Sequence, residues 1–211
     1  MTNESKQSII NKRCYPKNIQ GDEFSLYISN YPVIVKYLSE RIGNQNKVLV
    51  EMCCGVGVTL MFLGNSFKKV IGVDNDRKEL NYCSKNLKLA KLNKEPELIW
   101  GNVTDIELLK KIKADIVIYD IPYWREYESE GKGDLTKKNP ELKNFIERVK
   151  KYISKNIIIF APPHYSYSFI KSKLGDCEYE KIFINGKHDR NIVYLGKLKK
   201  KVGVAQKRLS T

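Results

Sequence analysis

Residues 47–57 read KVLVEMCCGVG. The apolar run Lys47–Val50 predicts a buried strand, and glycines at alternate positions, Gly55 and Gly57, predict a tight turn directly after it. Glycine has no Cβ, so the backbone of such a turn can approach a ligand closely. No third glycine completes a dinucleotide fingerprint, and no Gly-Lys-Ser/Thr of a phosphate loop follows. The stretch therefore predicts the first strand of an α/β domain, with a turn suited to a ligand at its end.

Outward from this stretch, short apolar runs alternate with amphipathic segments. The further apolar runs are Lys69–Val73, Leu98–Trp100, Asp115–Tyr119 and Asn156–Phe160. The amphipathic segments Asp76–Ala90 (Leu80, Cys83, Leu87 and Ala90 on one face) and Pro140–Tyr152 (Leu142, Phe145, Val149 and Tyr152) predict helices. This alternation predicts a parallel sheet with helices on both faces. Two last strands, Glu178–Ile184 and Asn191–Leu198, are joined by the turn-rich Asn185–Arg190 and predict an antiparallel hairpin at one side of the sheet.

The chain divides into three segments on this pattern. Residues 1–46 are an extension with one predicted helix, Pro32–Ile42, residues 47–198 are the α/β domain, and residues 199–211 are a basic tail that we expect to be loose. A length of 211 residues suits about one domain with a short appendage.

The charge balance points to a polyanionic partner. Lysine and arginine number 38 against 24 aspartates and glutamates, an excess of +14. Such an excess costs self-repulsion, and nucleic acid is the first partner to test, although a solvated lysine-rich surface would give the same count. The runs Lys199–Lys201 and Lys110–Lys111 are of the kind that contact phosphates without sequence preference.

Cysteine and histidine usage argues against metal and disulfide chemistry. The five cysteines form no Cys-x-x-Cys pair, and their odd number argues against a disulfide framework. His164 and His188 are too few for a histidine-rich metal site.

No apolar run approaches the roughly 18 residues of a membrane span, and the first residues lack the apolar core of a signal peptide. We therefore expect a cytoplasmic protein without a metal, outside the membrane.

Acidic residues follow the first two predicted strands. Glu51 closes the first strand before the glycine turn, where its carboxylate suits a cationic cofactor such as S-adenosylmethionine; a purely structural turn is the alternative. Asp74, nineteen residues beyond Gly55, ends the second strand, where a carboxylate can accept hydrogen bonds from a ribose diol. A helix cap is the alternative for Asp74, and Asp76 is the better placed of the two for that cap.

The third strand ends at Gly101-Asn102-Val103, a position that resembles the adenine-binding position of methyltransferases, and the Asn102 side-chain carbonyl can accept a hydrogen bond from the adenine amine. A turn asparagine would have the same sequence. The candidate cofactor residues are Glu51, Cys53, Gly55, Gly57, Asp74, Asn75, Asn102 and Val103.

The fourth strand carries the most specific motif, Tyr119-Asp120-Ile121-Pro122-Tyr123-Trp124. It resembles the Asp/Asn/Ser-Pro-Pro-aromatic signature of methyltransferases that act on exocyclic amines, with Ile121 in place of the first proline. In such a loop Asp120 and a main-chain carbonyl beside Pro122 accept the two amine hydrogens, which localises the nitrogen lone pair toward the methyl group. Tyr123 or Trp124 offers a ring face for the target base. The catalytic candidates are Asp120, Pro122 and Tyr123, and the substrate-binding candidates are Tyr123, Trp124 and His164.

The motifs together resemble the trimethylguanosine synthase family of RNA guanine 2-amino methyltransferases. The residues from Glu51 to Gly57 are similar to that family's Asp-x-Phe-Cys-Gly-x-Gly, and the residues from Asp120 to Tyr123 fall on its Ser-Pro-Pro-Trp. The resemblance covers about residues 45–198 and implies a Rossmann-like class I methyltransferase, with a mainly parallel seven-stranded sheet and a C-terminal antiparallel hairpin. Tyr123 stands where the family has a tryptophan against the cap guanine, and residues 1–46 do not clearly match the family's extension.

The resemblance implies transfer of a methyl group from S-adenosylmethionine to the 2-amino group of a guanosine in RNA, whether tRNA, rRNA or a small RNA. A DNA adenine or cytosine amine methyltransferase is an alternative, although 211 residues leave little room for a target-recognition domain. A protein glutamine methyltransferase and a weakly active RNA-binding protein on this scaffold are two others. Residues 125–138 are either a mobile lid over the target base or a surface loop, and His164 either contacts substrate or begins a helix.

Overall fold

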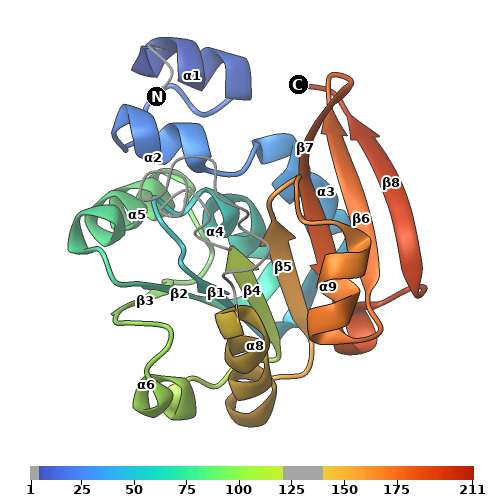
Figure 1. Cartoon of the computed structure of the whole chain (residues 1–211). Helices are drawn as coiled ribbons and strands as arrows, with labels where there is room; N and C mark the ends of the chain where they lie inside the picture. Colours follow the sequence, from blue (N-terminus) through green and yellow to red (C-terminus); the bar gives the residue numbers. More distant parts are fainter. Residues whose placement is uncertain (1–4, 121–139) are drawn as a thin grey trace. The chain divides into compact units, whose positions relative to one another are not determined.

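The computed structural model describes residues 5–120 and 140–211, which are the coloured parts of the chain in Figure 1. The chain forms two compact units. The first unit comprises Met1–Val103 with Ser210–Thr211, and the second comprises Thr104–Leu209. Each unit is an α/β structure built on its own strands.

The first unit contains three parallel strands in the order β3-β2-β1. These are β1 (Asn44–Met52), β2 (Phe67–Asp74) and β3 (Glu97–Trp100). The connections run through α4 (Val58–Leu63), η1 (Gly64–Ser66) and α5 (Arg77–Leu89). On α5 the predicted apolar positions Leu80, Cys83 and Leu87 are buried, whereas Ala90 is the C-cap residue. The βα order predicted from the apolar runs is confirmed here.

The N-terminal extension contains more helix than the sequence predicts. Besides α3 (Pro32–Ile42), it forms α1 (Lys6–Arg13) and α2 (Glu23–Ile28). Both added helices are short, and α1 is rich in polar residues, so neither shows a clear apolar period. Tertiary contacts hold them instead: the buried Tyr15 hydroxyl donates to the carbonyls of Leu26 (3.2 Å) and Asn30 (3.0 Å).

The second unit contains five strands in the order β4-β5-β7-β6-β8. They are β4 (Ile116–Asp120), β5 (Ile157–Ala161), β6 (Glu178–Ile184), β7 (Lys187–Tyr194) and β8 (Gly203–Leu209). The helical segments are α6 (Ile106–Lys111), α8 (Pro140–Tyr152), α9 (Tyr167–Leu174) and η2 (Gly196–Leu198). Strands β4 and β5 are parallel, and β6 and β7 form an antiparallel hairpin, as predicted. Its turn is Asn185-Gly186, with φ of 48° and 82°, the positive values that a two-residue hairpin turn favours. The predicted bounds of the hairpin's second strand, Asn191–Leu198, are wrong: β7 begins and ends four residues earlier, because the turn takes only two residues.

The described residues form eight strands, three in the first unit and five in the second, so the predicted number of seven is wrong. The added strand is β8, which lies where the sequence predicts a loose basic tail. It pairs in parallel with β6 from Glu178↔Gly203 to Ile184↔Leu209, and exposed and half-buried residues alternate along it. Its lysine and arginine residues hide this period in the sequence, because their long stems can cover a sheet while their charges reach water.

Among the described residues, no helix is long and apolar enough to cross a membrane.

Candidate functional site

The turn after β1 has an unusual backbone. Cys53, Gly55 and Gly57 adopt positive φ of 62°, 51° and 82°. The Gly57 N–H donates to the Cys54 carbonyl at 2.9 Å, and the Cys54 N–H donates to the Val73 carbonyl at 3.1 Å, so the turn folds back onto β2. A β-carbon on Gly57 would lie only 2.5 Å from Sγ of Cys83 on α5. Glycine is therefore required at Gly57 both for its conformation and for its close approach to α5.

Replacing Gly57 by alanine is expected to lower the free energy of unfolding by about 1–3 kcal/mol more than the matched change Gly186→Ala. Both glycines have φ of +82°, but nothing lies within 4 Å of a β-carbon on Gly186. The control therefore carries the backbone strain alone, and the difference measures the contact with Cys83. Denaturant unfolding of both variants gives the comparison; equal losses would show that the turn is not tightly packed against α5.

Asp74 connects the turns that follow β1 and β2. Its Oδ2 accepts the Gly55 N–H at 2.9 Å, and its Oδ1 accepts the Asp76 N–H at 3.0 Å. Asp76 is the N-cap of α5, with its side chain accepting from the N–H groups of Lys78 and Glu79. The helix cap is thus provided by Asp76, and the buried Asp74 carboxylate borders the glycine turn.

Several carboxylates surround this turn. Glu51 is 2% exposed, and a β-carbon on Gly55 would lie 3.8 Å from Oε2 of Glu79. Burial raises the pKa of the Glu79 carboxyl group, and the charges of Asp22, Asp74 and Asp76 raise it further. Glycine leaves the backbone of this turn accessible, and several carboxylates lie around it. Such a site suits a positively charged ligand, and S-adenosylmethionine is positively charged at its sulfonium and amino groups.

The N-terminal segment braces the same turn through two contacts that sequence reasoning missed. The first centres on Asn86, which is fully buried on α5: its Oδ1 accepts the Gln20 N–H (2.7 Å), and its Nδ2 donates to the carbonyls of Gln20 and Val56 (both 2.8 Å). Val56 lies between the two turn glycines, so Asn86 links the extension to the turn. A polar residue between Cys83 and Leu87 on the buried side of a predicted helix is the signal that could have identified it.

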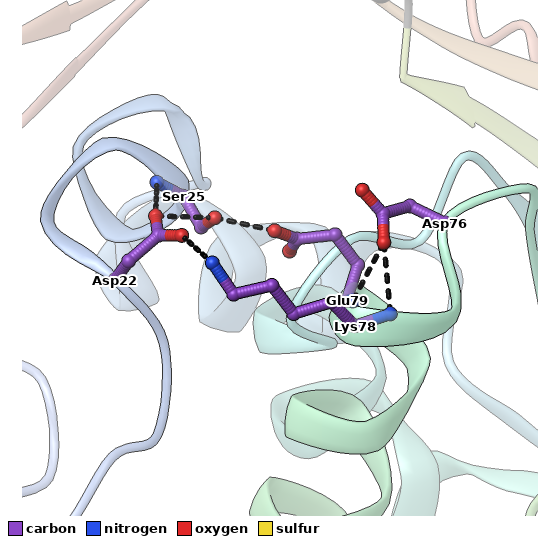
Figure 2. Close-up of polar contacts among 5 residues, drawn as sticks. All are labelled: Asp22, Ser25, Asp76, Lys78 and Glu79. Atoms are coloured by element: carbon purple, nitrogen blue, oxygen red, sulfur yellow. Dashed lines mark hydrogen bonds and ion pairs between the residues drawn. The ribbon is translucent and has the colours of Figure 1, made fainter.

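The second contact is the polar network of Figure 2, in which Ser25 lies between Asp22 and Glu79. Lys78 Nζ also contacts Asp22 Oδ2 at 2.8 Å. Burial alone would raise the pKa of Asp22, but the hydrogen bonds from Lys78 and Ser25 outweigh burial and lower the pKa to about 2. The network holds Glu79 beside Gly55 and makes Glu79 a candidate cofactor residue beyond those predicted.

The remaining cofactor candidates lie at the ends of β2 and β3. The Gly101 N–H donates to the Asp74 carbonyl (2.9 Å), which brings the segment of Asn102 and Val103 next to β2. Trp100 donates its indole N–H to the Asn75 carbonyl (3.0 Å), and the Arg77 guanidinium lies 4.0 Å from the centre of the Trp100 ring. All eight predicted cofactor residues thus belong to the first unit and lie at or just after the carboxyl ends of its three parallel strands.

The substrate candidates belong to the second unit. Asp120 is the last residue of β4 and is paired with Phe160 of β5. Pro122, Tyr123, Trp124 and the predicted lid at 125–138 lie outside the described residues. His164 follows β5, so it lies at the same edge of this unit's strands as Asp120. Partial burial lowers the pKa of His164.

The turn that carries His164 is held by buried groups. Asn191 Nδ2 donates to the carbonyls of Pro162 (2.7 Å) and Tyr165 (3.2 Å), and the Tyr179 hydroxyl donates to the Tyr165 carbonyl (2.7 Å). Burial raises the pKa of Tyr179 to about 12, so this hydroxyl keeps its proton. His164 is thus an exposed residue on a turn that side chains of β6 and β7 hold in place.

Metal ligation has no candidate in residues 5–120 and 140–211: no group of three or more His, Cys, Asp or Glu side chains is arranged to hold an ion.

Two curated relatives share part of the sequence. An rRNA N(6)-adenosine-methyltransferase of Caenorhabditis elegans is 28% identical over 93 residues, which are 43% of this chain and 44% of the relative. A release factor glutamine methyltransferase of Borreliella burgdorferi is 34% identical over 133 residues, which are 57% of this chain and 44% of the relative. The matches span less than half the length of each relative.

Solved structures share the fold. Magnesium protoporphyrin IX methyltransferase of Synechocystis PCC 6803 with bound S-adenosylmethionine has a TM-score of 0.56 at 17% identity, over 92% of this chain and 99% of that one. An S-adenosylmethionine-dependent methyltransferase of Clostridium acetobutylicum has a TM-score of 0.52 at 12% identity, over 82% and 89%. The Rossmann-like fold predicted from the sequence is confirmed.

The sequence pattern of the RNA cap guanine-N2 methyltransferase family matches residues 46–198, which is most of the chain and includes every candidate site residue. The chain therefore belongs to this family and has the class I fold of S-adenosylmethionine-dependent methyltransferases.

Proposed function

We propose that the protein transfers the methyl group of S-adenosylmethionine to the exocyclic 2-amino group of a guanosine in RNA. The observation that carries the proposal is the position of Asp120, the last residue of β4 and the first of the motif typical of amine methyltransferases. The family to which the chain belongs is described as RNA cap guanine-N2 methyltransferases, which supports a guanine amine as the target. The excess of +14 charges supports a nucleic-acid substrate over a protein one.

The cofactor is held by the first unit in this proposal. Glu51 and Glu79 face its positive methionine end, Asp74 accepts hydrogen bonds from the ribose, and Asn102 accepts one from the adenine amine. Cys53, Gly55 and Gly57 form the turn beneath the cofactor, and Asn75 and Val103 flank the adenine. When bound, S-adenosylmethionine supplies an electrophilic methyl group on sulfur.

The target amine is oriented by Asp120 and the residues that follow it in the sequence. An amine on an aromatic ring is a weak nucleophile because its lone pair is delocalised into the ring. Asp120 and the main-chain carbonyl beside Pro122 accept its two hydrogens and direct the lone pair toward the methyl group. Tyr123, with Trp124 beside it, stacks on the base, and His164 contacts the substrate. Most of the rate enhancement comes from this positioning. The proton lost on alkylation passes to Asp120 or to water.

A second candidate is methylation of the 6-amino group of an adenosine in RNA. It is favoured by the similarity to the rRNA N(6)-adenosine-methyltransferase, which is 28% identical over 93 residues. The acceptor chemistry at Asp120 would be the same, because both targets are exocyclic amines on a purine. The two candidates therefore differ in the base that enters the site.

The class of substrate is tested by supplying labelled S-adenosylmethionine with total RNA, with DNA or with a protein lysate in parallel. We expect label in RNA, and none in any pool with the Asp120→Ala variant. Label in DNA or protein alone would overturn the proposal. Binding of S-adenosylmethionine, followed by calorimetry, controls for an inactive preparation, because a folded enzyme binds the cofactor whichever substrate it uses.

A further inference from the structure

A row of three side chains crosses strands β7, β6 and β8 of the second unit. Phe183 of β6 pairs with His188 on one side and with Arg208 on the other. The rings of Phe183 and His188 are stacked, with centres 5.2 Å apart and planes inclined by 27°, and the Arg208 guanidinium carbon lies 5.0 Å from the Phe183 ring centre. Arg208 is exposed, and the two rings are half-buried. We refer to these three residues as the 183–188–208 row.

The surroundings of the row are basic. Lys181, Lys187 and Lys207 lie within two positions of its members along the chain. Glu178 and Glu180 are 2% and 5% exposed, and Asp189 Oδ2 lies 2.6 Å from Arg190 Nε. The acidic residues of these three strands are therefore buried or ion-paired, whereas Arg208 and Lys187 are exposed.

The row lies at the same strand edge as the substrate candidates. Strands β5 and β6 are both antiparallel to β7, so β6 runs in the direction of β5, and β8 is parallel to β6 (Figure 1). Phe183 and Arg208 are near the carboxyl ends of their strands. Asp120 and His164 lie at the carboxyl ends of β4 and β5 in the same unit. The fold thus places a cationic and aromatic surface along the edge where Asp120 lies, the residue proposed to accept a hydrogen bond from the target amine.

A hydrogen-bonded path joins the row to the turn of His164. The fully buried Asn191 donates through Nδ2 to the carbonyls of Pro162 and Tyr165, which directs its Oδ1 to His188 Nε2, 2.8 Å away. Since Oδ1 can only accept, His188 carries its proton on Nε2. The imidazole orientation is therefore fixed by the same residue that holds the His164 turn.

We propose that the 183–188–208 row binds the single-stranded RNA next to the methylated nucleotide, a proposal that rests on RNA being the substrate. The Arg208 guanidinium, backed by the Phe183 ring, presents a flat, positively charged surface on which a base can stack, and the nearby lysines contact phosphates. Any base can stack on such a surface, so the row raises the affinity for RNA and fixes the position of the strand, but it does not select a sequence. This role explains the pairing of an exposed cation on β8 with an aromatic ring on β6.

The test compares Arg208→Ala, Arg208→Lys and Lys155→Ala in binding to a fluorescently labelled single-stranded RNA that the wild-type enzyme methylates. Lys155 is an exposed cation before β5, at the opposite edge of the same strands, and controls for loss of one charge. We expect Arg208→Ala to weaken RNA binding about tenfold and to make the log–log salt slope shallower by about 0.7. Arg208→Lys keeps the slope but loses most of the affinity, because an ammonium has no plane for stacking. Lys155→Ala retains the affinity.

Three readouts make the outcomes distinct. Thermal unfolding and S-adenosylmethionine affinity should match the wild type in all three variants, and KM for RNA should rise in Arg208→Ala with little change in kcat. Wild-type RNA affinity in Arg208→Ala would overturn the proposal and leave an acidic protein as the partner of the row. Full affinity in Arg208→Lys would overturn stacking. A wild-type enzyme that methylates no RNA overturns the proposed function instead, which separates the two failures.

Discussion

Replacing Asp120 by alanine is expected to slow methyl transfer about 100- to 1000-fold, the usual effect of losing one preorganised hydrogen-bonding group at a reacting centre. Asp120 ends β4, whereas every predicted cofactor residue lies in the first unit. The affinity for S-adenosylmethionine should therefore stay within about threefold of the wild type, because a substitution usually has little effect on binding at a site that it does not contact. Single-turnover transfer of labelled methyl groups to RNA measures the first effect, and calorimetric titration measures the second.

Asp120→Asn is the matched control for this variant. Asparagine keeps the size of the side chain and one acceptor oxygen, and it occurs at this position in the amine-type signature, so it should retain far more activity than alanine. Near-normal turnover of Asp120→Ala would remove Asp120 from the mechanism. Equal losses of rate and of cofactor affinity would show that Asp120 acts on the cofactor.

Replacing Asp74 by alanine is expected to weaken S-adenosylmethionine binding by about 10- to 150-fold, as for the loss of hydrogen bonds to a charged group of roughly 1.5–3 kcal/mol. Each Asp74 oxygen accepts one backbone N–H, from Gly55 and from Asp76, and retains a second lone pair for a ribose hydroxyl. The variant therefore loses the ribose acceptor and the link between the two turns. Calorimetry measures the affinity, and thermal unfolding measures the stability.

Asp76→Ala separates the cofactor role of Asp74 from helix capping. Asp76 caps α5 through the Lys78 and Glu79 N–H groups, so its loss should cost about 1 kcal/mol of stability without changing cofactor affinity. If Asp74→Ala behaves in the same way, Asp74 serves only the local structure. A selective loss of affinity in Asp74→Ala supports the ribose assignment.

The fold was predictable where apolar periodicity is strong. The runs that became β1, β2, β4 and β5 are nearly continuous in valine, leucine and isoleucine, as expected of strands covered on both sides. The helix α5 was predictable from its buried positions and its Asp76 cap. Strand β8 was not, because lysine and arginine interrupt its period, and α1 and α2 were not, because tertiary contacts rather than their own pattern stabilise them.

The candidate cofactor site was predictable to the extent that it follows strand ends. Glu51 and Asp74 lie at the carboxyl ends of β1 and β2, and Asn102 follows β3. The carboxyl ends of these parallel strands share one edge. The contacts of the N-terminal segment could not be predicted in this way. Ser25 and Glu79 are 54 positions apart and Gln20 and Asn86 are 66 apart, and no local pattern specifies such pairings. They are a property of the folded chain, and they add Glu79 and Asn86 to the surroundings of the glycine turn.

The central claim, methylation of a guanosine amine in RNA, is tested most directly by identifying the methylated nucleoside. RNA is incubated with the enzyme and S-adenosylmethionine carrying a deuterated methyl group, digested to nucleosides and analysed by mass spectrometry against synthetic standards. The account predicts deuterated N2-methylguanosine, absent from the sample treated with Asp120→Ala. Deuterated N6-methyladenosine as the sole labelled nucleoside would contradict the guanosine assignment, and an active enzyme that leaves RNA without label would contradict the account as a whole.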